Sequence, residues 1–144
     1  MKWTSLIKIN PDGIKHAFEY FVALMLLSWA VSFVIDDGMY DLYTYSYLDD
    51  FGPPYFWATI FLFLGLIIIK GAGKECSRWR SYVGMSMCLS GFLWTLISIG
   101  FILTYPPYSS VMITYPVLAI FSYLVGFGVL DEAKHCRRRE NDRL

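Results

Sequence analysis

The distribution of basic residues constrains this chain more than any other feature of its sequence. All twelve Lys and Arg residues fall within three segments, 1–16, 70–80 and 131–144. The stretches between these segments contain four apolar runs, each long enough for a helix that crosses the ~30 Å hydrocarbon core of a bilayer. Because Lys and Arg in short loops mark the cytoplasmic side of a membrane protein, the sequence predicts four crossings with every basic segment on one side.

The predicted fold class is therefore all-α, an integral membrane four-helix bundle with the N and C termini cytoplasmic. The hydrophobic share of 56% and the mean hydropathy of +0.46 are high for a globular domain and ordinary for a membrane bundle. We expect a single membrane domain over residues 1–144. Its spans lie at about 17–35, 54–70, 81–104 and 111–130, its outer loops at 36–53 and 105–110, and its cytoplasmic tail at 131–144.

Local signals support these boundaries. Asn10 has the side chain of a helix N-cap, and Pro11 suits the first helical position, where its missing N–H costs nothing. Aromatic residues gather at the predicted span edges, among them Tyr82 and Tyr115, as expected for rings that prefer the interface between membrane and water.

The third predicted span carries a stripe of small or weakly polar side chains at spacings of three and four residues. It consists of Ser81, Gly84, Cys88, Gly91, Thr95 and Ser98. Small residues let helices approach closely in lipid, where no hydrophobic force joins them. One interpretation is a packing seam within the chain. The other is a self-association face, or the lining of a narrow oligomeric pore that tolerates water.

Glu19 is the one carboxylate inside a predicted span. An ionisable residue within a membrane is a functional hypothesis by default, because its burial is expensive without a partner. Glu19 lies ~6 Å above Lys15 on a helix, so a pair with Lys15 at the cytoplasmic surface is the simpler expectation. Coupling of a proton or cation to transport through Glu19 is the alternative.

The outer loop 36–53 contains five acidic residues and no base. The spacing of a calcium-binding loop is absent, so a solvated acidic loop is the expected state. Tyrosines are favoured at protein interfaces, where they offer large contact areas at low entropic cost. If the chain recognises a partner outside the cytoplasm, this loop is the expected site of recognition, through Tyr43, Tyr45, Tyr47, Asp49 and Asp50.

The predicted cytoplasmic side carries the remaining candidates. Arg137, Arg138 and Arg139 suit contact with anionic lipid headgroups or with a cytosolic protein partner. Cys76 and Cys136 face a reducing compartment in this topology and Cys88 lies in a span, so free thiols are expected. The spacing of Cys76, His135 and Cys136 matches no zinc signature, and no metal site is predicted.

Catalytic chemistry has no visible basis in this sequence. No arrangement of nucleophile, base and oxyanion donors, no His-x-x-x-His pair and no phosphate-binding glycine loop is present. We therefore expect a protein that is not an enzyme and that has no cofactor. Membrane lipids, other copies of the chain and a protein at the tail or outer loop are the expected partners, and nucleic acid is not.

In its size, its four spans, its basic tail and its opening IKINPDGI before an apolar run, the chain resembles small four-span membrane proteins of bacteria and their phages. Holins, superinfection-exclusion proteins and immunity proteins against pore-forming bacteriocins are of this kind. The resemblance implies a self-associating bacterial inner-membrane protein, either a holin-like or phage-defence pore or a membrane sensor. The alternatives are an immunity or exclusion protein that binds a partner in the bilayer or through the acidic loop, and a small ion or solute carrier that uses Glu19.

Overall fold

The structure is a computed structural model that describes residues 11–35, 48, 50, 52–74, 78–104 and 111–141. Within these residues it contains helices and no strand. The four long helices are α1 (Pro11–Ile35), α3 (Pro54–Gly71), α4 (Arg78–Thr104) and α5 (Val111–Asn141). Each is long and apolar enough to cross a membrane, which confirms the prediction of an all-helical protein with four candidate spans.

Prolines and glycines define the helix ends where the sequence provides them. α1 begins at Pro11, at the position predicted from its suitability for the first helical turn. α3 begins at Pro54, after Pro53 in an extended conformation, and the Ala72 N–H closes its last turn on the Ile68 carbonyl. Gly73 follows with φ +72°, a left-handed conformation that favours glycine.

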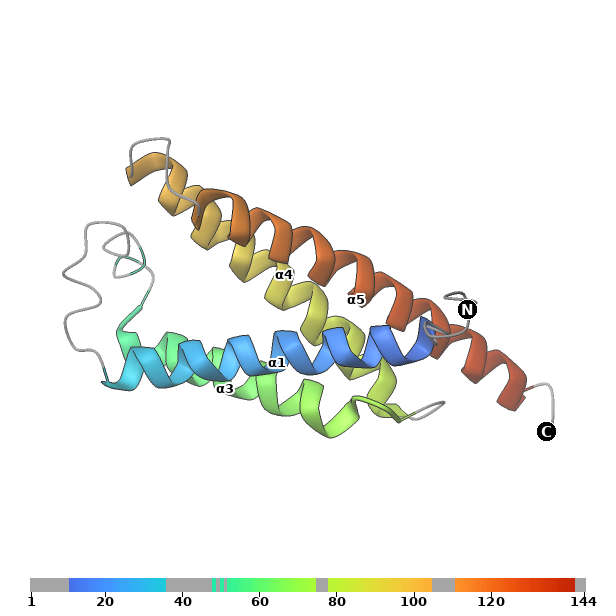
Figure 1. Cartoon of the computed structure of the whole chain (residues 1–144). Helices are drawn as coiled ribbons and strands as arrows, with labels where there is room; N and C mark the ends of the chain where they lie inside the picture. Colours follow the sequence, from blue (N-terminus) through green and yellow to red (C-terminus); the bar gives the residue numbers. More distant parts are fainter. Residues whose placement is uncertain are drawn as a thin grey trace, which may run out of the picture.

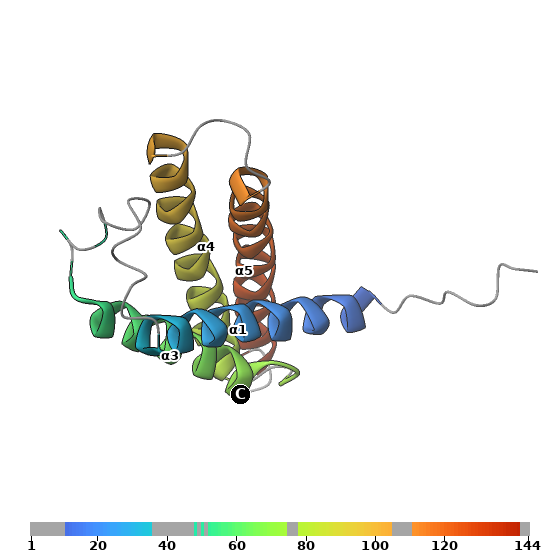
Figure 2. The same cartoon turned by 60° about the vertical axis from the view of Figure 1, so that its left-hand side comes forward.

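Two antiparallel hairpins make up the bundle. α1 packs along α3, and α4 packs along α5, while the contact between the hairpins runs chiefly between α3 and α4. Figure 2 shows the two hairpins crossing at a steep angle, and in Figure 1 they diverge toward the end where α1 and α4 finish. We call this the acidic end, because the acidic segment 36–53 joins α1 to α3 there.

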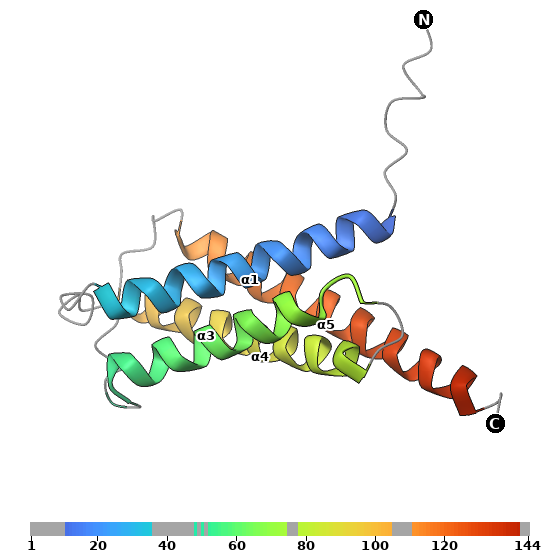
Figure 3. The same ribbon diagram turned by 90° about the horizontal axis from the view of Figure 1, so that it is seen from below.

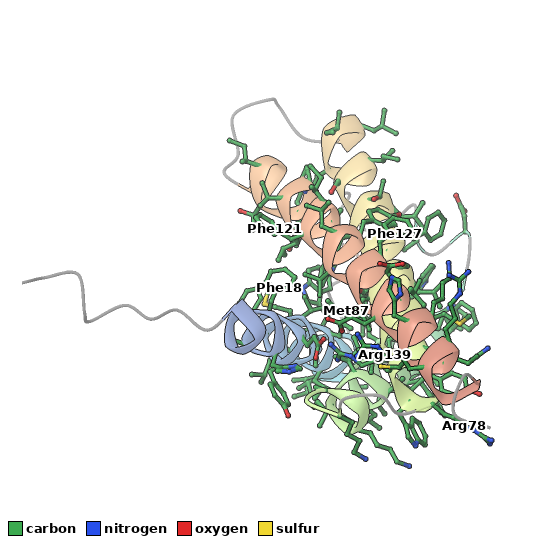
Figure 4. All side chains as sticks on the ribbon, turned by 90° about the vertical axis from the view of Figure 1, so that its right-hand side faces the viewer. Phe18, Arg78, Met87, Phe121, Phe127 and Arg139 are labelled. Atoms are coloured by element: carbon green, nitrogen blue, oxygen red, sulfur yellow. The ribbon has the colours of Figure 1, made fainter. Side chains whose placement is uncertain are left out.

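The opposite end, at which α1 and α4 begin and α3 and α5 finish, is here called the basic end. Arg78 and Arg139 lie there, at the end that faces the viewer in Figure 4. α5 continues as a helix through this region to Asn141, so residues 131–141 of the predicted polar tail extend the last span. From below, α1 and α3 lie across the α4–α5 pair (Figure 3).

Apolar side chains lie both inside and outside the bundle. Val22, Leu26, Ile68 and Met87 are completely buried between the helices, whereas Leu103 is 78% exposed. A helix that is apolar on all sides needs an apolar solvent on its outer face. The outward apolar surface therefore suits lipid, in agreement with an integral membrane protein.

Candidate functional site

A buried ionic network joins three helices near the basic end. Glu19 Oε1 on α1 lies 2.7 Å from Arg80 Nη1 on α4. Arg80 Nη2 donates a hydrogen bond of 3.1 Å to Glu132 Oε2 on α5. His16 Nδ1 lies 3.2 Å from the other oxygen of Glu19. One guanidinium therefore connects the α1–α3 hairpin to the α4–α5 hairpin.

Burial makes this network consequential for stability. The Glu19 side chain is 0% exposed and that of Arg80 4%, whereas Glu132 is 45% exposed and can also be hydrated. Glu19 Oε1 and Arg80 Nη1 form no aligned hydrogen bond to each other or to another protein atom, so their close approach is an ion pair. Removing one member of such a pair strands a charge away from water.

The network corrects the expectation for Glu19. The sequence predicted a carboxylate that reaches the cytoplasmic surface and pairs with Lys15, but the structure buries Glu19 completely. The Lys15 side chain lies outside the described part of the structure. Sequence reasoning missed Arg80, which it placed in a loop, because α4 begins at Arg78 rather than at residue 81. Arg80 precedes Val83 by three residues and Met87 by seven, so a helix places all three on one face, and Val83 and Met87 are buried in α4. This spacing was the signal that could have identified Arg80 as buried.

An aromatic cluster joins the hairpins farther along the bundle. The indole of Trp29 on α1 meets that of Trp94 on α4 edge to face at 5.9 Å, and Trp94 stacks on Tyr115 of α5 at 5.6 Å. Phe61 of α3 also belongs to the group, 6.0 Å from Trp94. Nearer the basic end, Phe18 packs on Phe121 at 5.5 Å (Figure 4). Tyr115, predicted at the membrane interface, thus contributes to packing between helices.

In the described part of the chain, two buried polar groups near the bundle centre lack a hydrogen-bond partner. Trp94 Nε1 and Ser122 Oγ are buried without a hydrogen bond. Buried polar groups are normally satisfied.

The small-residue stripe of α4 packs against α5 of the same chain. A Cβ on Gly84 would lie 2.7 Å from Leu130 and 3.1 Å from the Gly126 carbonyl oxygen. A Cβ on Gly91 would lie 3.2 Å from the Ala119 carbonyl oxygen. At these positions the stripe therefore serves as a seam within the chain.

The other stripe positions differ in their surroundings. Cys88 faces a seam residue, since a Cβ on Gly126 would lie 2.7 Å from its Sγ. Thr95 and Ser98 each donate a hydroxyl hydrogen bond to a carbonyl one turn earlier in α4, to Gly91 at 2.9 Å and to Trp94 at 2.6 Å. Ser81 lies at the start of the helix beside the basic residues of α5.

An apolar groove lies between α3 and α4, on the side where the hairpins diverge. Its volume is about 760 Å³ and its walls are almost entirely apolar. At its acidic end the indole N–H of Trp57 donates a 3.2 Å hydrogen bond to the Leu48 carbonyl, which fixes Leu48 against the groove. The lining residues are Leu48, Phe56, Trp57, Ile60, Leu64, Leu89, Phe92, Leu93, Leu96, Ile99, Gly100 and Leu103.

The remaining predicted site residues lie at the two ends of the bundle. Asp50 is exposed, while Tyr43, Tyr45, Tyr47 and Asp49 lie outside the described residues. Arg137, Arg138 and Arg139 are exposed on the last turns of α5.

Cys136 corrects a further expectation. It is disulfide-bonded, so the prediction of a free thiol at this position is wrong. Cys88 is a free cysteine, as predicted.

No metal site emerges from the part of the chain that the structure covers. Within it, no three His, Cys, Asp or Glu side chains are grouped so as to hold a metal ion. Compared with protein-family models, curated protein sequences and solved structures, the chain matches none of them. The groove, the ionic network and the charge distribution are therefore the features of the molecule that bear on its function.

Proposed function

We propose that this chain is a non-enzymatic binding protein of a bacterial inner membrane, of the immunity or exclusion type. It binds an apolar helix of another protein within the bilayer, and that helix carries basic residues on its outer flank. The basic end faces the cytoplasm in this proposal, as the positive-inside rule requires. The apolar groove between α3 and α4 is the observation that carries the proposal.

The groove has the shape and chemistry for a helix partner. Large side chains such as Phe92 and Leu103 border it and are more than half exposed, so they offer contact area without rearrangement of the core. In lipid, helices associate by van der Waals packing and not by a hydrophobic force. A helix that fills this groove makes van der Waals contacts with its walls. Flexible acyl chains fill the groove less completely, because they lose more conformational entropy when they are ordered there than a helix does.

Charge complementarity identifies the outer flank of the partner. The loop 36–53 contributes five acids and no base, and Leu48 ties this loop to the mouth of the groove. Asp50 is exposed beside it. Attraction between exposed charges extends over about 8–10 Å at physiological ionic strength, so a basic flank on the incoming helix meets the acidic loop as the helix enters the groove.

The other hypotheses receive less support. A self-associating pore relied on the stripe of α4, whose glycines lie against α5 of the same chain. A carrier that uses Glu19 would have to break its ion pair with Arg80 and pass the aromatic cluster around Trp94, which is completely buried. Neither hypothesis explains an apolar groove beside an acidic loop.

A binding test uses synthetic helices in liposomes that contain the full chain. The probe is a single-span peptide of alternating Leu and Ala with two lysines on its outer flank, and the reference peptide carries two glutamates there. Energy transfer between labels on the chain and on the peptide measures binding. Leu89→Trp fills the groove, and Leu124→Trp places the same bulk on lipid-exposed α5 as the control.

We expect the lysine-flanked peptide to bind at least tenfold more tightly than the glutamate-flanked one. Binding should fall with Leu89→Trp and with replacement of the five loop aspartates by Asn, and Leu124→Trp should leave it unchanged. Equal binding of both peptides, or no effect of Leu89→Trp, would contradict the proposal. Energy transfer between two labelled copies that Leu89→Trp abolishes would identify a second copy as the occupant instead.

A further inference from the structure

A second cavity lies at the basic end, between the first turns of α4 and the last turns of α5. Its volume is about 470 Å³. Ser81 lines it from α4, and Lys134, Arg137 and Arg138 line it from α5. The cavity is separate from the apolar groove, and its residues play no part in the proposed binding of a helix.

The cavity has an excess of positive charge. Among the described residues, its lining contains three permanent cations and one acid, Asp131. That acid lies 3.5 Å from His135 Nε2 on the same helix, and the three cations outnumber it. The neighbouring Glu132 turns toward Arg80 and is engaged in the ionic network. An anion in the cavity therefore faces cations with little competition from carboxylates.

Apolar surface adjoins this charged cavity on the side of the membrane. Leu130 belongs to its lining, and Phe127, about one turn earlier in α5, is 63% exposed. On α4, Met85 follows Ser81 by one turn and is 55% exposed. A ligand that is anionic at one end and apolar along the rest can contact both the charged cavity and the apolar surface beside it. A free anion contacts the charged cavity alone.

We propose that this cavity binds the headgroup of an anionic phospholipid, with the acyl chains along the exposed apolar side chains of α4 and α5. Ser81 donates to a phosphate oxygen, and Lys134, Arg137 and Arg138 neutralise its charge. Arg139 is exposed on the same helix and does not line the cavity. It therefore serves as a matched control for the diffuse attraction between any basic segment and an anionic surface.

The test measures retention of lipid by the purified full chain. Phosphatidylglycerol is titrated into the detergent-solubilised protein, and native mass spectrometry counts the bound lipids. Phosphatidylcholine and inorganic phosphate form separate arms. Each juxtamembrane cation contributes about fivefold to the affinity for an anionic lipid. We therefore expect Arg138→Gln to weaken binding about fivefold and the double variant with Lys134→Gln about 25-fold, whereas Arg139→Gln changes it less than twofold.

A second variant keeps the charge and removes the space. Ser81→Trp fills the cavity and should release phosphatidylglycerol with no change in net charge. Circular dichroism establishes that each variant remains helical. If Arg139→Gln lowers the affinity for phosphatidylglycerol as much as Arg138→Gln does, the attraction is diffuse and the proposal is wrong. Unchanged retention of phosphatidylglycerol by Ser81→Trp would also overturn it. Binding of inorganic phosphate as tight as that of the lipid would identify an anion site with no role for the acyl chains.

Discussion

Replacing Arg80 by Met is the perturbation whose cost follows most directly from the structure. Met removes the guanidinium and keeps much of the side-chain length. Glu19, at 0% exposure, then has His16 at 3.2 Å as its remaining ionisable partner within the described residues. Breaking a buried pair by removing one member costs about 3–5 kcal/mol of folding free energy. We expect a loss of that size for Arg80→Met.

A double-mutant cycle tests the physical reason for this loss. Replacing Glu19 by Leu in the same chain removes the stranded charge, and apolar replacement of both members of a buried pair is often neutral or stabilising. Glu132, at 45% exposure, stays hydrated without Arg80. The double variant should therefore recover most of the stability that the single variants lose.

Reversible unfolding in mixed detergent micelles, followed by circular dichroism, gives the four free energies that the cycle needs. Arg78→Met is the control, since Arg78 is exposed two residues earlier on α4, and exposed substitutions usually stay within about 0.5 kcal/mol. Losses that add in the double variant, or a cost of Arg80→Met below about 1 kcal/mol, would refute the argument that the pair is buried and coupled.

Three further predictions follow from packing and covalent structure. Gly84→Leu should lower the free energy of unfolding by about 1–3 kcal/mol through overpacking, because a Cβ there would lie 2.7 Å from Leu130. Gly128→Leu is the control and should cost little, because a Cβ on Gly128 meets nothing within 4 Å. Unfolding in micelles compares the two variants. Trp94→Ala should cost about 3–5 kcal/mol by the same assay, because it empties a completely buried site. Cys136 should react with a thiol reagent only after reduction, as seen by gel shift; reaction without reductant would restore the original prediction of a free thiol.

The four helices were predictable because their signals are local. Lys and Arg at the span ends, apolar runs of sufficient length and Pro11 at a helix start each depend on neighbouring residues alone. Such signals need no knowledge of how the helices pack. The third span was predicted to begin at residue 81, whereas α4 begins at Arg78, since the basic segment before it contains residues that suit either a loop or an exposed first turn.

The ionic network and the use of the stripe depend on tertiary structure. Arg80 and Glu132 are 52 positions apart in the chain, and nothing in the sequence specifies which faces of α1, α4 and α5 meet. In water, the apolar face of a helix identifies its buried side. In a membrane the buried face and the lipid-facing face of a helix are both apolar. The stripe of α4 therefore predicted a close helix contact but did not show which helix makes it. The disulfide at Cys136 was also not predicted. The expectation of a free thiol there came from the reducing compartment assigned to that side of the membrane, and the tertiary position of Cys136 could not be used.

The position of the apolar groove follows from which helix faces carry small residues. α4 meets α5 through Gly84 and Gly91, whose missing side chains let the two backbones approach closely. The face of α4 toward α3 carries Phe92 and Ile99 instead, and their bulk lines a gap of about 760 Å³. Arg80 holds the hairpins together at the basic end, where Glu132 still reaches water, and the aromatic cluster holds them in the middle. Beyond that cluster no ion pair or small-residue seam joins α3 to α4 among the described residues, so the hairpins diverge toward the acidic end and leave the apolar groove between them.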